Sequence, residues 1–199
     1  MKRTAFKLGE KLFAEIDATI QGHVCMYANE AGLLADAVRL AGNGDHLEIG
    51  SMWGGSAVLA ALVKQKYKLT GKVVCVDPFR DGDCSPGFPG GRPNEQIFWA
   101  NMDAAGVADR IELHTCYSDP WPFPAERRFA SIFVDGDHLG HWPLTDWHNA
   151  RQHTDLVIYH DLYPHERDVM AAVAVIRQDP EWAQVAQVGS LAVFGRVAK

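Results

Sequence analysis

The chain has 199 residues, of which 47% are hydrophobic and 22% are charged, and this composition is typical of one globular domain with a sizeable core. The formal net charge of −6 argues against a general nucleic-acid surface, which needs clustered Lys and Arg to displace phosphate counterions. No apolar run in the sequence reaches the roughly 20 residues that span a bilayer. We therefore expect a small-molecule partner, with no nucleic acid and no membrane, and the oligomeric state stays open, a homo-oligomer included.

Residues 1–25 begin with a basic stretch, but charged residues interrupt the apolar core that a secretory signal needs. We interpret this segment as a helical lead-in to the domain. The cysteines are scattered, with no C-x-x-C pair and no zinc-ribbon spacing. Such spacing does not fit a disulfide framework, so the expected location is the reducing cytoplasm.

Helices and strands are predicted to alternate along the rest of the chain, from helical spacing of apolar residues and from short β-branched runs. In chain order we expect a helix at 33–41, a strand at 46–50, a helix at 55–65, strands at 72–77 and 110–114 around a helix at 94–104, a strand at 129–134, a helix at 142–152, a strand at 156–159, a helix at 167–178, and a hairpin of 184–188 with 191–195. This order predicts one α/β domain over residues 1–199. Its doubly wound, mostly parallel seven-stranded sheet would end in an antiparallel C-terminal hairpin.

Residues 78–93 form one long predicted loop that contains Pro86-Gly87 and Pro89-Gly90-Gly91. Loops of this length in compact domains are often lids or binding loops. We interpret this one as a lid or substrate loop, with a tolerated surface insertion as the alternative.

Polar or glycine residues follow each of the five predicted parallel strands. In an open parallel sheet, ligands bind outside the carboxyl ends of the strands. The residues at those ends are Glu48 and Gly50, Asp77, Ser118, Asp135, and the pair His160-Asp161. Their recurrence after otherwise apolar strands predicts a binding site along this edge.

The turn from Gly50 to Gly55 joins the first of these strands to the next helix. Glycines at such a place let the backbone turn sharply and approach a ligand. The spacing is not G-x-G-x-x-G, and Met52-Trp53 would crowd a pyrophosphate, which argues against a nicotinamide dinucleotide. Asp77 follows Gly50 by 27 residues and is suitably placed to accept hydrogen bonds from two ribose hydroxyls. A plain strand-to-helix turn is the alternative.

The run from Leu47 to Ser56 (LEIGSMWGGS) resembles motif I of class I S-adenosylmethionine-dependent methyltransferases. Within that class the chain resembles the branch of cephalosporin-hydroxylase-like proteins and natural-product sugar O-methyltransferases. The same branch carries Val-Asp-Pro, Phe-Val-Asp-Gly-Asp-His and His-Asp motifs, which here are Val76-Asp77-Pro78, Phe133–His138 and His160-Asp161. The resemblance spans roughly residues 26–196.

This resemblance implies a Rossmann-like methyltransferase fold that binds S-adenosylmethionine. Glu48 and Gly50 would lie beside the methionine moiety, Asp77 would bind the ribose, and Ser118 would lie near the adenine. The full implied cofactor set is Glu48, Gly50, Ser51, Gly54, Gly55, Ser56, Asp77, Ser118 and Asp135. The chain departs from the family in having Cys116-Tyr117-Ser118 where Gly-Asp-Ser is frequent, and Arg151–Thr154 where Lys-Pro-Gly-Gly is usual.

A second group of polar residues follows the fourth and fifth parallel strands. The ends of adjacent strands lie about 5 Å apart, so Asp135, His160 and Asp161 can converge. Two carboxylates and an imidazole suit a divalent cation, with Mg²⁺ or Mn²⁺ favoured by the oxygen ligands. Metal-dependent O-methyltransferases that this branch resembles use such a cation to lower the pKa of the acceptor hydroxyl. The resemblance also implies His138 as the general base, and Asp137 is the other candidate catalytic residue.

These features predict an S-adenosylmethionine-dependent enzyme that methylates a hydroxyl of a small molecule with the help of Mg²⁺ or another divalent cation. One alternative is a metal-dependent hydrolase that uses Asp135, His138, His160 and Asp161. A nicotinamide-dependent oxidoreductase and a cofactor-binding protein without catalysis are the others, and the glycine spacing disfavours the oxidoreductase. The sequence does not identify the methyl acceptor.

Overall fold

The structure, a computed structural model, describes residues 4–79 and 94–197. At its centre lies a seven-stranded sheet with the strand order β3-β2-β1-β4-β5-β7-β6. The strands from β1 to β5 pair in parallel, whereas β7 pairs antiparallel with both β5 and β6. The strands are β1 (His46–Ile49), β2 (Val73–Val76), β3 (Ile111–His114), β4 (Ser131–Val134), β5 (Leu156–Tyr159), β6 (Trp182–Val188) and β7 (Leu191–Arg196).

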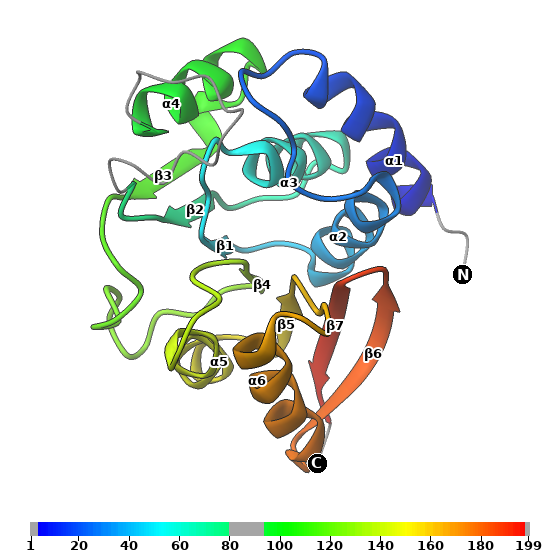
Figure 1. Cartoon of the computed structure of the whole chain (residues 1–199). Coiled ribbons are helices and arrows are strands. Elements are labelled where there is room, and N and C mark those ends of the chain that lie inside the picture. The colour runs from blue at the N-terminus through cyan, green and yellow to red at the C-terminus, as the bar shows by residue number, and fades with distance from the viewer. Residues whose placement is uncertain (1–3, 80–93, 198–199) are drawn as a thin grey trace.

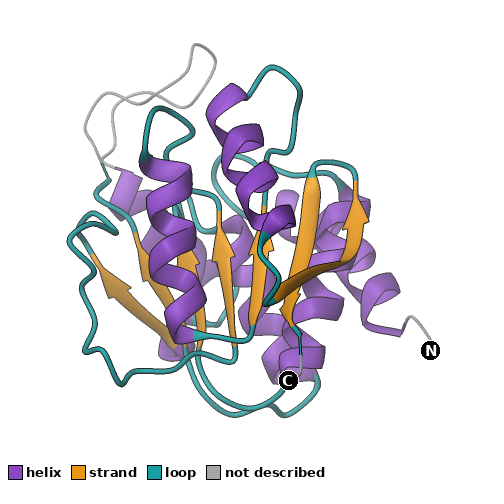
Figure 2. Cartoon of the chain, turned by 90° about the horizontal axis from the view of Figure 1, so that it is seen from below, coloured by secondary structure: helices purple, strands orange, loops and turns teal. Residues whose placement is uncertain are grey.

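Helices cover both faces of this sheet (Figures 1 and 2). On one side lie α2 (Ala28–Ala41), α3 (Gly55–Lys66) and α4 (Asn94–Ala104), and α1 (Thr4–Asp17) packs on α2 and α3. On the other side lie α5 (Trp142–His153) and α6 (Arg167–Gln178). A 3₁₀ turn, η1 (Ala108–Arg110), precedes β3. The predicted doubly wound, mostly parallel sheet with an antiparallel C-terminal hairpin is confirmed.

The core has two parts because successive strand residues point to opposite faces of the sheet. Phe133 packs into the cluster beneath α2 and α3, while its neighbour Ile132 packs with Trp147 of α5 in the second cluster. β1, β2 and β4 are buried at every residue. Strands that are covered on both faces in this way are mostly apolar, and their polar side chains can reach a ligand only where the strands end.

The starts of α2, β4 and β6 differ from their predicted positions by two residues or more, and the first two differences have a visible cause. α2 begins at Ala28 rather than at residue 33, because the Glu30 side chain accepts a hydrogen bond from the Tyr27 N–H and caps an extra first turn. β4 begins at Ser131 rather than at residue 129, since the Phe129 and Ala130 N–H groups bond to loop and helix carbonyls outside the ladder. Of the predicted lid, residues 78 and 79 are described, and residues 80–93 lie outside the described residues.

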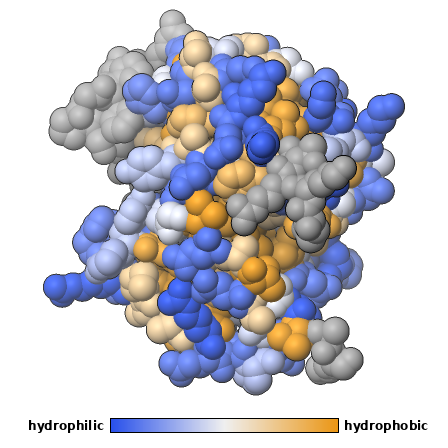
Figure 3. Space-filling view, turned by 90° about the vertical axis from the view of Figure 1, so that its right-hand side faces the viewer, coloured by the Kyte–Doolittle hydropathy of each residue, from blue (hydrophilic) through white to orange (hydrophobic). Residues whose placement is uncertain are grey.

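The face that carries α1, α2 and β6 mixes hydrophilic and hydrophobic residues (Figure 3). β6 is an edge strand of the sheet, and its Val185 side chain is exposed. Among the residues that the structure describes, no helix combines the length and the apolar character needed to cross a bilayer.

Candidate active site

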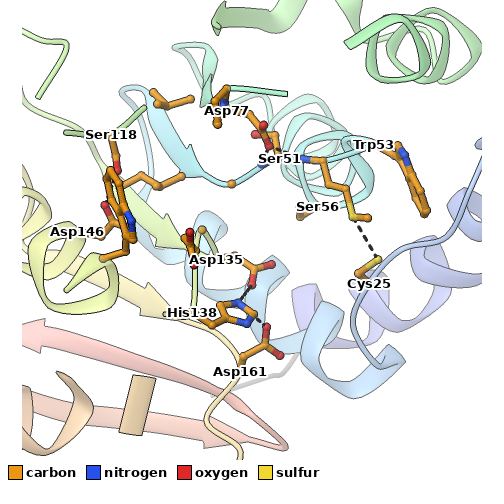
Figure 4. A pocket seen from close by; sticks show the side chains of 18 of the residues that line it. Cys25, Ser51, Trp53, Ser56, Asp77, Ser118, Asp135, His138, Asp146 and Asp161 are labelled. Atoms are coloured by element: carbon orange, nitrogen blue, oxygen red, sulfur yellow. Dashed lines mark hydrogen bonds and ion pairs between the residues drawn. The ribbon is translucent and has the colours of Figure 1, made fainter. Parts of the chain in front are cut away.

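A cavity of about 530 Å³ lies at the carboxyl edge of the parallel strands (Figure 4). Its size is within the range of small-molecule sites. The wall includes the turn after β1, Asp77 after β2, Tyr117 and Ser118 after β3, residues 135–138 after β4, and Asp161 after β5, together with His23, Cys25 and Met26 from the segment between α1 and α2. The carboxyl ends of the parallel strands, where the sequence predicted a binding site, therefore border one continuous space.

Asp77 holds the glycine turn, residues 50–55, in its shape. Its Oδ2 accepts hydrogen bonds from the N–H groups of Ser51 and Met52, each at 2.7 Å, and its Oδ1 accepts one from Phe79 at 2.7 Å. A carboxylate has about four acceptor positions, so three bonds leave capacity for a ligand hydroxyl. The side chain is partly exposed to the cavity. Asp77 thus organises the turn and also faces the cavity.

Close packing explains two glycines of the turn. Gly50 has φ +82°, and a Cβ built there would lie 2.1 Å from the Asp135 carbonyl oxygen. Gly54 has φ +81°, and its Cβ would lie 2.2 Å from Cε of Met102 in α4. Both positions therefore exclude a side chain because of protein neighbours. Ser51, Gly55 and Ser56 line the cavity directly.

Glu48 lies beneath the turn rather than in the cavity wall. It is fully buried, and neither carboxyl oxygen has a hydrogen-bond partner among the described residues. Burial raises its pKa to about 8, against the opposing influence of the Ser56 and Ser51 hydroxyls, which are near without completing a hydrogen bond of normal geometry. The side chain is therefore neutral near pH 7, and as a protonated acid it has a proton to donate.

Ser118 meets an acidic partner that the sequence interpretation missed. Its hydroxyl donates to Oδ1 of Asp146 in α5 at 2.6 Å, and both side chains are buried in the cavity wall. Burial raises the pKa of Asp146 to about 7, which the Ser118 hydrogen bond partly offsets. The rings of Tyr117 and Trp142 stack beside them, with centroids 5.6 Å apart. Asp146 follows Trp142 by four residues, so helical spacing was the signal that could have found it.

Three side chains converge at the opposite end of the cavity, and we call Asp135, His138 and Asp161 the Asp-His-Asp cluster (Figure 4). Nε2 of His138 lies 3.0 Å from Asp161 Oδ2 and 4.0 Å from Asp135 Oδ1. One donor atom from each residue falls within 4.8 Å of the others, a separation that one cation can bridge. The ion pair with Asp161 raises the pKa of His138 above its ordinary value, against the effect of burial.

The imidazole in this cluster is not the one that the sequence predicted as a metal ligand. His160 is buried behind the cluster, with Nδ1 3.0 Å from Asp135 Oδ1 and Nε2 3.4 Å from Glu30 Oε2. Both ring nitrogens therefore face carboxylates already, and His138 takes the place beside Asp135 and Asp161. Asp137, predicted as catalytic, is exposed at the rim, where it accepts a hydrogen bond from the Leu139 N–H.

A family model described as methyltransferase domain matches residues 47–162, which is more than half of the chain. The match covers the glycine turn, Asp77, Asp146 and the whole Asp-His-Asp cluster. A comparison with curated proteins found no significant sequence match.

Several solved structures share the fold. The O-methyltransferase TomG from Streptomyces achromogenes, involved in tomaymycin synthesis and solved with SAM, is 16% identical with a TM-score of 0.63, covering 98% of this chain and 90% of that one. An O-methyltransferase from Bacillus cereus in complex with SAH is 15% identical with a TM-score of 0.60, covering 100% and 92%. CalS11, a TDP-rhamnose 3′-O-methyltransferase of calicheamicin biosynthesis, is 17% identical with a TM-score of 0.56, covering 82% and 76%. At these identities the similarity is one of fold.

Proposed function

The chain belongs to the methyltransferase domain family, and we propose that it transfers the methyl group of S-adenosylmethionine to a hydroxyl of a small molecule. The observation that carries this proposal is the single cavity, which joins the glycine turn and Asp77 to the Asp-His-Asp cluster. One end offers groups suited to a nucleoside, and the other offers groups that accept a proton. An O-methylation needs both within one space.

At the cofactor end, the chain's own residues match a nucleoside in three ways. Asp77 has acceptor capacity for ribose hydroxyls, and the stacked Tyr117 and Trp142 rings provide an aromatic surface for a base. Asp146 provides a carboxyl group beside Ser118 for the polar edge of that base. The bound cofactor supplies an electrophilic methyl carbon on a sulfonium, so the protein has to align the reactants and accept one proton.

At the acceptor end, the Asp-His-Asp cluster is the group that takes up this proton. As the acceptor oxygen bonds to the methyl carbon and the carbon–sulfur bond breaks, the hydroxyl proton leaves the oxygen. His138 lies beside two carboxylates that stabilise its protonated form. Because that ion pair raises the pKa of His138, activity should increase as pH rises through a value above 6.5, when the imidazole loses its proton.

A divalent cation also fits this cluster, and two observations support it. Donor atoms from Asp135, His138 and Asp161 lie close enough to share one ion, and both carboxylates are partly shielded from solvent. Such a cation would lower the pKa of the acceptor hydroxyl. The sequence favoured Mg²⁺ or Mn²⁺, and an imidazole nitrogen beside two carboxylates is more typical of Mn²⁺, Fe²⁺ or Zn²⁺ than of Mg²⁺.

The test is methyl transfer from isotopically labelled S-adenosylmethionine to a panel of sugars, polyols and phenols, followed by mass spectrometry. We expect one class of hydroxyl compound to gain the labelled methyl group. Labelling of an amine or a carbon in place of a hydroxyl would contradict the proposed acceptor. The same assay after chelation and dialysis, together with metal analysis of the purified protein, tests whether the reaction needs a cation. A cation-assisted reaction should be lost on chelation and restored by adding one metal. A reaction that uses His138 as the base without a metal should continue unchanged.

A further inference from the structure

Glu30 is a buried carboxylate that neither the sequence motifs nor the cavity wall includes. It lies in the first turn of α2 with no exposed surface. Its Oε1 accepts hydrogen bonds from the Ser190 N–H at 2.7 Å and the Ser190 hydroxyl at 2.8 Å. Its Oε2 accepts one from the Tyr27 N–H at 2.8 Å and lies 3.4 Å from Nε2 of His160. These four contacts fill the acceptor positions of a carboxylate, so its orientation is fixed.

His160 connects this carboxylate to the active site. Its ring is buried between Glu30 and the Asp-His-Asp cluster, and it reaches Asp135 Oδ1 at 3.0 Å and Asp161 Oδ1 at 3.4 Å through Nδ1. An imidazole with a carboxylate at each nitrogen can turn in neither direction without losing a hydrogen bond. The ring therefore links Glu30 to Asp135 through one contact at each nitrogen.

The β6–β7 turn completes the support. Gly189 has φ +57°, and a Cβ built there would lie 2.4 Å from Glu30 Oε1, so this turn closes directly over the carboxylate. The Ser190 carbonyl accepts a hydrogen bond from the Leu162 N–H at 3.0 Å, next to Asp161 in the chain. The same turn thus fixes Glu30 on one side and the segment after β5 on the other.

We propose that Glu30 is a positioning residue that acts through His160 to hold the Asp135 carboxylate at the site of proton removal. The inference rests on the proposed function, because Asp135 matters only if chemistry occurs at the cluster. Stability alone does not explain the arrangement, since a buried carboxylate–imidazole pair costs desolvation free energy that well-packed apolar residues would avoid. A contact that fixes a reacting group within a fraction of an ångström does explain it, because a misplacement of about 1 Å can cost roughly 10²-fold in rate.

The experiment compares Glu30→Gln and His160→Gln, singly and together, with Glu112→Gln as the matched control. Glu112 also accepts hydrogen bonds, from the guanidinium of Arg127 and from the His114 ring, but it lies in β3, outside the cavity wall. We expect Glu30→Gln to lower kcat by roughly 10- to 10²-fold with KM for S-adenosylmethionine unchanged. Glu112→Gln should lower stability to denaturant and leave kcat unchanged. The double variant should be no slower than His160→Gln alone, since both residues act along one path.

Three results would overturn the inference. The first is a kcat for folded Glu30→Gln that equals the wild-type value. The second is a double variant whose loss of kcat is the product of the two single losses. The third is a loss of kcat in Glu112→Gln as large as that in Glu30→Gln. Crystal structures of the wild type and Glu30→Gln with bound S-adenosylhomocysteine give a readout without turnover: the Asp135 carboxylate should shift in the variant and the glycine turn should not. If the wild type methylates no acceptor, the proposed function fails, whereas an unmoved Asp135 carboxylate makes only the positioning role fail.

Discussion

The glycine turn and the Asp-His-Asp cluster lie on the same sheet edge, but different contacts hold them. The turn is fixed by backbone N–H groups that bond to Asp77 and by glycines packed against neighbouring atoms. The cluster consists of charged side chains that pair with one another and with a buried histidine. The backbone of the turn therefore has its shape before a ligand binds. The paired side chains of the cluster, in contrast, can give up an ion pair in order to bind a proton or a cation. Variants should therefore separate binding at the turn from chemistry at the cluster.

The largest effect is expected for His138→Ala. Removing the imidazole from beside Asp135 and Asp161 should lower methyl-transfer turnover by roughly 10²- to 10⁴-fold, the usual contribution of a general acid–base group. Affinity for S-adenosylhomocysteine should stay within a factor of about two, since the contacts at the turn are untouched. Single-turnover kinetics with the isotopically labelled cofactor measures the first quantity. His148→Ala, an exposed site on α5, is the control and should behave as the wild type.

Among substitutions in the glycine turn, Gly50→Ala should lower the free energy of unfolding the most. The new Cβ would lie 2.1 Å from the Asp135 carbonyl oxygen at a positive φ, so overpacking adds to backbone strain. We expect a loss of about 2–4 kcal/mol in the free energy of unfolding, measured in urea. Gly106→Ala is the matched comparison, because Gly106 has φ +66° and nothing within 4 Å of its Cβ. It should lose only about 1 kcal/mol, and equal losses in the two variants would contradict the packing explanation.

Asp77→Ala should weaken cofactor binding rather than the chemical step. The variant loses the acceptor for the Ser51 and Met52 N–H groups and the group proposed for the ribose. Hydrogen bonds to a charged group contribute about 1.5–3 kcal/mol each, so affinity for S-adenosylhomocysteine should fall roughly 10- to 10²-fold. Equilibrium dialysis measures this change, with the exposed Asp103→Ala as the control. A drop in turnover at saturating cofactor with unchanged affinity would place Asp77 in the chemistry instead.

A further prediction concerns Glu48, whose effect appears only in the pH dependence of stability. Its pKa is about 8 in the fold and near 4.5 when the chain is unfolded. Between these values the unfolded chain loses a proton that the folded chain keeps, so this group makes stability fall as pH rises from about 4.5 to about 8. The slope is about 1.4 kcal/mol per pH unit at most. Glu48→Gln, which cannot ionise, should flatten this part of the curve in urea unfolding, and an unchanged slope would show that other groups cause it.

Local patterns predicted the fold and the turn well, because both depend on residues close in sequence. Apolar runs and glycine spacing indicated each strand and the doubly wound order. Asp146 and Glu30 were missed, since each meets its partner across a long separation: Asp146 bonds to Ser118, and Glu30 bonds to Ser190, 160 residues away. The arrangement of His138 and His160 on either side of the carboxylates could not be predicted for a similar reason. The strand-end rule places both near Asp135, and only three-dimensional packing shows which ring is buried behind it.

The claim that the turn binds the methyl donor while the cluster carries out the chemistry is tested most directly by calorimetric titration with S-adenosylhomocysteine, for wild type and His138→Ala side by side. We expect saturable binding of one ligand per chain, with closely similar affinity in both proteins. If neither protein binds the ligand at millimolar concentration, the turn does not hold this cofactor. If only His138→Ala fails to bind, binding and chemistry are not separate, and the division of the cavity proposed above is wrong.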